Sequence, residues 1–117
     1  MDSQILIPTS RLTVADLERF RNAPFENMIK FTVDIRLRKI ALGGDMHADS
    51  EEVLLSAGSG QVDIWGGNLW PWAQPPRIEY ISLINIRPAM ENRGMEIQLE
   101  EIRTAVRSIV HAWVELE

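Results

Sequence analysis

Alternating apolar and polar positions predict the clearest strand of this chain, over Met28–Leu37. The apolar side chains of this segment fall on one face: Ile29, Phe31, Val33, Ile35 and Leu37. The other face is polar, and such a period of two is typical of a strand buried on one side. The RLRK segment then indicates a tight turn, and Lys39–Leu42 returns as a short partner strand that Gly43 and Gly44 end.

Three further segments have strand character. The apolar run Ile5–Ile7 is closed by Pro8, which favours an edge strand because proline lacks a backbone donor. Gln61–Trp70 is predicted to be a strand broken or bulged at its two glycines. Arg77–Arg87 carries apolar residues on both faces in its middle, which predicts a central strand covered on both sides.

Capping patterns and apolar spacing predict three helices. Thr13 and Asp16 form a capping box that starts a helix running to about Arg21. A second capping box at Asp49–Glu52, with the aspartate as N-cap, opens a helix that Gly58 ends. From Leu99 to Leu116 the apolar residues recur every three or four positions, which is typical of an amphipathic helix.

The resulting order, β-α-β-β-α-β-β-α, predicts an α+β fold. Short turns between strands favour a two-layer domain with a largely antiparallel sheet of about four to five strands and helices packed on one face. A chain of 117 residues has the size of one domain, so residues 1–117 are predicted to form a single globular unit.

Composition narrows the function classes. The chain has no cysteine, which excludes disulfides and thiolate metal sites, and the net charge of −5 weighs against nucleic-acid binding. No apolar run approaches the ~18 residues of a membrane span, and the N-terminus does not resemble a signal peptide. The expectation is a cytoplasmic protein with no membrane partner. No phosphate loop, dinucleotide fingerprint or zinc-protease helix is present, so no cofactor is expected.

Six polar residues form the candidate ligand site: Asp45, His47, Asn85, Arg87, Asn92 and Arg93. The last four follow or end the predicted strand Arg77–Arg87, and arginine forks with amide donors suit a carboxylate or another small anion. A small-anion or carboxylate-binding domain, with a polar site at one end of the sheet, is therefore the leading interpretation. The alternative is structural, with the arginines paired to Asp45 and Asp49.

Two other functions stay open. In a small hydrolase or transferase, His47 would be the general acid or base, oriented by Asp45, with Arg87 stabilising charge. In a non-catalytic interaction module, the segment Trp65–Trp72, which holds three tryptophans, would form a homodimer contact, since tryptophan is enriched at interfaces.

Four segments together resemble a family of small uncharacterised bacterial proteins, a domain of unknown function. They are IKFTVDI at Ile29–Ile35, ALGGDMHAD at Ala41–Asp49, QVDIWG at Gln61–Gly66 and SLINIRPAMENRGME at Ser82–Glu96. The combination of the second and fourth segments is the specific part. The resemblance supports the fold and class of the chain, and it implies no activity and no site residue.

Overall fold

The computed structural model of the protein describes residues 4–116, so Met1–Ser3 and Glu117, which belong to the N-terminal segment and the acidic C-terminal end, lie outside it. A five-stranded sheet forms the centre, with every neighbouring pair antiparallel. Its strands, from one edge to the other, are β1 (Ile5–Leu6), β4 (Lys39–Gly43), β3 (Ile29–Asp34), β5 (Ile64–Trp70) and β6 (Arg77–Glu79). A small parallel pair joins β2 (Leu12–Thr13) to β7 (Val114–Glu115).

Within residues 4–116, two α-helices and four short 3₁₀ helices complete the fold. The α-helices are α1 (His47–Ser56) and α2 (Glu100–Trp113). The 3₁₀ helices are η1 (Ala15–Phe20), η2 (Gln61–Asp63), η3 (Leu83–Asn85) and η4 (Pro88–Met90). The predicted α+β class with a mainly antiparallel sheet is confirmed.

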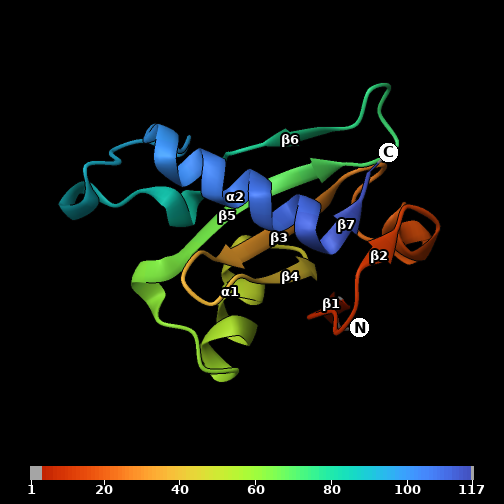
Figure 1. Cartoon of the computed structure of the whole chain (residues 1–117), viewed down its shortest axis with the longest axis horizontal. Helices are drawn as coiled ribbons and strands as arrows, with labels where there is room; N and C mark the ends of the chain where they lie inside the picture. The colour runs from red at the N-terminus through yellow and green to blue at the C-terminus, as the bar shows by residue number, and fades with distance from the viewer. Residues whose placement is uncertain (1–3, 117) are drawn as a thin grey trace.

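The helices cover both faces of the sheet, so the expectation of helices on one face is wrong. In Figure 1, α2 lies in front of the sheet and α1 behind it. Val33 of β3 packs in one core with Val106 of α2. The neighbouring Thr32 points the opposite way and donates from Oγ1 to Ser50 Oγ of α1, at 3.1 Å. Successive strand residues face opposite sides, so these contacts place the two α-helices in separate layers.

The strand β3 is consequently buried on both sides. Its apolar face is buried as predicted at Ile29, Phe31 and Val33. Thr32 and Asp34, on the face predicted to be solvated, have no exposed surface either. Thr32 is hydrogen-bonded to Ser50 of α1, and Asp34 Oδ1 accepts from the backbone N–H groups of Arg36 and Leu37. The central strand of the domain is therefore β3.

Arg77–Arg87 is not a central strand. Only Arg77–Glu79 is strand, at the edge of the sheet. The chain then leaves the ladder because Ser82 Oγ accepts a hydrogen bond from the Ile84 backbone N–H and caps η3. Leu83, which should have been covered as part of a central strand, is 66% exposed.

The first capping box is confirmed and the second is wrong. The Thr13 and Asp16 side chains each accept from the other's backbone N–H, at 3.2 and 2.9 Å, although the helix they start is 3₁₀. α1 begins two residues before Asp49, and its N-cap position is Met46, which has no capping side chain.

The strand predicted at Gln61–Trp70 also differs from the structure. β5 pairs with β3 without interruption from Ile64 to Leu69, so there is no bulge at Gly66 and Gly67. The chain before Ile64 forms η2 instead of strand. The described part of the chain offers no helix with the length and hydrophobicity needed to cross a membrane.

Candidate functional site

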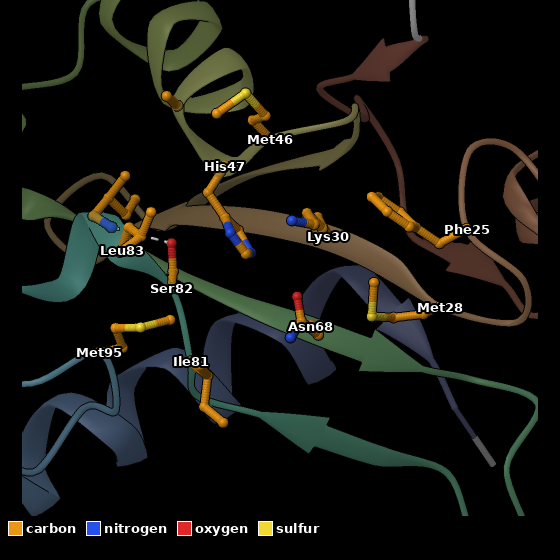
Figure 2. A pocket seen from close by; sticks show the side chains of 12 residues that line it. Phe25, Met28, Lys30, Met46, His47, Asn68, Ile81, Ser82, Leu83 and Met95 are labelled. Atoms are coloured by element: carbon orange, nitrogen blue, oxygen red, sulfur yellow. Dashed lines mark hydrogen bonds between the residues drawn. The ribbon is translucent and has the colours of Figure 1, made fainter.

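A cavity of about 360 Å³ opens beside the first turn of α1, on the α1 side of the sheet. We call it the His47 cavity. Figure 2 shows polar atoms of four side chains gathered at its centre, with apolar side chains around them. The polar residues are Lys30, His47, Asn68 and Ser82. The apolar wall includes Phe25, Met28, Met46, Ile81, Leu83 and Met95.

The sheet brings the floor of the cavity together. Lys30 of β3 and Asn68 of β5 are directly paired in the strand register, so their side chains lie next to each other on the α1 side. His47 enters from above as the first residue of α1, and Ser82 precedes η3. Four segments far apart in the sequence therefore meet at one point (Figure 2).

His47 is 8% exposed, and its Nε2 lies 2.7 Å from the Gly67 carbonyl oxygen. A carbonyl can only accept, so Nε2 carries a proton and donates it, and Nδ1 is the basic nitrogen of the neutral ring. Burial lowers the pKa of His47, and the nearby positive charge of Lys30 lowers it further, while the hydrogen bond to Gly67 and the proximity of the Asn68 side chain oppose this shift. The ring is thus neutral at neutral pH.

Glycine at position 66 allows this packing. A Cβ atom at Gly66 would lie 2.9 Å from Ser82 Cβ and 3.1 Å from His47 Cδ2. Both contacts are closer than carbon atoms approach without displacement. Gly66 therefore lets the serine and the imidazole lie directly against the β5 backbone.

Lys30 is the charged group of the cavity. Within residues 4–116, no Asp or Glu lines this cavity and no ion pair includes Lys30. Its Nζ lies 5.0 Å from the centre of the Phe25 ring, which is within cation–π range. The lining residues therefore contribute a positive charge to the cavity, with Glu79 bonded to Asn68 beside them, although the chain as a whole carries a charge of −5.

Asn68 presents an unused acceptor. Its Nδ2 donates to Glu79 Oε1 at 3.2 Å, and since a carboxylate cannot donate, this contact fixes the orientation of the amide. Oδ1 then has no hydrogen-bond partner in the described part of the chain and is shielded from solvent. A buried amide oxygen without a donor is unfavourable by about 1–3 kcal/mol.

Two of the predicted site residues, Asn85 and Asn92, use their side-chain amides to hydrogen-bond backbone groups. Asn85 is fully buried; its Oδ1 accepts from Gly66 N–H at 2.9 Å, and its Nδ2 donates to the carbonyls of Gly66 and Met95. Asn92, also fully buried, donates from Nδ2 to the carbonyl of Asn85 among others and accepts from the Gln98 N–H. These bonds use the amide groups that a ligand would need.

Arg87 lies in a second cavity, of about 450 Å³, which we call the Arg87 cavity. Its Nη2 is 3.6 Å from Glu51 Oε2, and its guanidinium lies over the Trp65 ring at 4.9 Å. Burial lowers the pKa of Arg87, whereas the charges of Glu51 and Asp63 raise it. The carboxylate partner of Arg87 is thus Glu51 rather than Asp45 or Asp49.

The structure does not gather the six predicted residues into one site. His47 and Arg87 line different cavities, which meet at Leu83 and Ile84. Asp45 and Arg93 are exposed, and neither lines either cavity. His47 is oriented by the Gly67 carbonyl, a role expected of Asp45.

The tryptophans of the segment Trp65–Trp72 have separate environments. Trp65 is fully buried in the core. Trp70 donates from Nε1 to Glu79 Oε1 at 2.9 Å, and Trp72 packs against the core beneath the Arg21 guanidinium. Six of the seven large apolar residues that are exposed in the described part of the chain lie elsewhere, in the walls of the two cavities.

Sequence reasoning missed Lys30, Asn68 and Ser82 as site residues. Lys30 stands on the polar face of an alternating strand, where a solvated lysine is the ordinary interpretation. The one available signal was Gly66-Gly67 before Asn68, since glycine inside a strand often marks the close approach of another group.

Comparison with known proteins identifies the family and nothing beyond it. No curated protein and no solved structure gives a significant match to this chain. One family model does match, over residues 6–113, and its description is a protein of unknown function, DUF5674. This match spans nearly the whole chain and confirms the resemblance to a domain of unknown function. The protein belongs to the DUF5674 family.

Proposed function

We propose that the protein binds a small ligand in the His47 cavity, and that this ligand carries a carboxylate on an apolar body. The single observation that carries the proposal is a cavity with a lysine and no acid, in a chain with a net charge of −5. The volume of about 360 Å³ is at the lower end of the range for small-molecule sites.

The residues that line the cavity suit both parts of this ligand, its carboxylate and its apolar body. Lys30 would pair with the carboxylate, and a charge-assisted bond of this kind contributes about 1.5–3 kcal/mol. Met46, Met95 and Phe25 offer apolar contacts, and methionine adapts to ligands of different shape. The ligand class agrees with the carboxylate expected from the sequence, but the cation is Lys30 instead of Arg87 or Arg93.

The test is a titration followed by NMR of the backbone amides. The probes are hexanoate, octanoate, phenylacetate and indole-3-acetate, each compared with its primary amide. We expect the acids to shift the amides of Gly67 and Asn68, and the neutral amides to shift them far less. Lys30→Gln should weaken acid binding by roughly 10- to 100-fold, which corresponds to the loss of one charge-assisted bond.

Arg107→Gln is the matched control, because Arg107 is exposed on α2, on the opposite side of the sheet. It removes the same charge and should leave acid binding unchanged. If acids and neutral amides bound equally well, or if Lys30→Gln bound the acids as tightly as the wild type, the proposal would be wrong.

A further inference from the structure

Exposed apolar side chains are concentrated around the two cavities. Seven large apolar residues are exposed in the described part of the chain, and six of them line the His47 cavity or the Arg87 cavity. We call these six the Leu83 surface: Met46, Val62, Ile81, Leu83, Ile86 and Met95. The seventh, Leu37, lies at the β3–β4 turn. Contiguous exposed apolar patches rimmed by polar groups mark interaction sites.

Leu83 stands at the centre of this surface, because the two cavities share it and Ile84 as their common wall. It is 66% exposed, yet η3, on which it lies, is held firmly. Ser82 caps η3, and the buried Asn85 side chain ties it to Gly66 and Met95. An exposed apolar side chain that is already held in place loses little conformational freedom on binding, which favours its use in an interface.

We propose that the Leu83 surface docks an acidic, apolar segment of another protein. Apolar side chains of this segment lie in the hollows on both sides of Leu83, and one of its carboxylates pairs with Lys30. The inference rests on the proposed function, since it identifies the carboxylate-bearing ligand of the His47 cavity as part of a polypeptide.

Charge complementarity favours an acidic partner over a second copy of this chain. Lys30 and Arg87 are the cations of the two cavities, and the one acid, Glu51, is already paired with Arg87. In a symmetric contact through Leu83, the unpaired Lys30 of each copy would meet no unpaired acid among the cavity-lining residues of the other copy, because Glu51 is already paired. An acidic segment supplies the missing opposite charge.

The unused acceptor of Asn68 favours a polypeptide over a simple acid. Asn68 Oδ1 is shielded and lacks a donor within residues 4–116. A carboxylate has no proton to give it at neutral pH, whereas a peptide backbone offers an N–H at every residue except proline. A carboxylate at Lys30 and a backbone N–H at Asn68 can come from one short segment, because the two side chains are neighbours on the sheet.

The test is selection of random dodecamer peptides displayed on phage, using the immobilised full chain. We expect enriched peptides with a Glu or Asp, or a free terminal carboxylate, flanked by apolar residues. Lys30→Glu should change the preference from acidic to basic peptides, and Leu83→Asp should reduce affinity for a synthetic copy of the best peptide by at least 10-fold. Octanoate should compete with the wild-type peptide.

Two matched variants control for charge and hydrophobicity. Arg107→Glu makes the same charge reversal on the α2 side, and Leu37→Asp alters the exposed leucine outside the surface. Both should retain the peptide. Binding of small acids without enrichment of acidic peptides would overturn the docking proposal and leave the proposed function standing; absence of both would overturn the two together. A dimer in sedimentation equilibrium that Leu83→Asp dissociates and Leu37→Asp does not would assign the surface to a second copy, and would also overturn it.

Discussion

Asn85→Ala is expected to destabilise the domain severely, because one side chain replaces a missing strand partner. The amide of Asn85 bonds both backbone groups of Gly66, donating to its carbonyl and accepting from its N–H, each at 2.9 Å. It also donates to the Met95 carbonyl at 3.1 Å. Alanine would leave three backbone groups without these bonds next to a fully buried position.

The magnitude follows from these three bonds. Leaving the Gly66 N–H and the Gly66 carbonyl unpaired is unfavourable by about 1–3 kcal/mol each, whereas the Met95 carbonyl keeps the hydrogen bond from the Ser82 N–H, so the expected total is about 3–5 kcal/mol. Domains of this size are stable by only about 5–15 kcal/mol, so the change removes a large share of the total. With an m-value of about 2 kcal/mol/M, the urea midpoint should fall by about 2 M.

Urea unfolding followed by tryptophan fluorescence measures this loss, and hydrogen exchange of the Gly66 amide reports the local effect. Asn22→Ala is the matched control, since Asn22 is exposed and the substitution should shift the midpoint by less than about 0.3 M. If Asn85→Ala lowered the midpoint by less than about 0.5 M with Gly66 exchange unchanged, water would be replacing the amide and the assigned role would be incorrect.

Three further changes test the region around the cavities. The lowered pKa of His47 means that the unfolded chain binds its proton first, so stability should fall as the pH drops below about 6.5. His47→Gln should flatten this dependence in urea titrations at pH 5–8. Gly66→Ala should lower stability by about 1–3 kcal/mol in the same assay, because its Cβ would lie 3.1 Å from the His47 ring. Arg87→Met should lower stability more than the double variant with Glu51→Gln, since the single change leaves a carboxylate without its partner; equal losses would contradict the ion pair.

Local sequence signals predicted those elements whose determinants lie close together in the chain. The Thr13–Asp16 capping box needs only four consecutive residues, and its reciprocal hydrogen bonds form as predicted. The spacing of apolar residues in the last segment predicted α2, whose buried residues Val106 and Ile109 fall on the expected stripe. Its end was placed too late, at Leu116, because the chain turns into β7 to pair with a strand near the N-terminus.

The errors arose where distant contacts decide the outcome. Thr32 and Asp34 were interpreted as solvent-facing because a period of two cannot reveal that α1 covers the second face of β3. In the run that ends at Ile86, apolar residues on both faces suggested a central strand, yet Ile81 and Leu83 are exposed. The serine within this run was the contrary signal, since Ser82 offered the chain a local cap in place of the ladder.

The candidate ligand site lies mostly at other residues than the sequence predicted, for a related reason. Asparagines beside arginines suggested a ligand site. In an irregular segment, however, the backbone groups lack strand partners, so buried side-chain amides hydrogen-bond to the backbone instead. Asn85 and Asn92 are used in this way, and the result is the rigid turn that displays Leu83. In such a domain, a ligand site is therefore sought among the buried polar groups that make no hydrogen bond within the protein. Within residues 4–116, six buried side-chain atoms lack a hydrogen-bond partner, and one of them, Asn68 Oδ1, belongs to a residue that lines the His47 cavity, where Lys30 is its neighbour on the sheet.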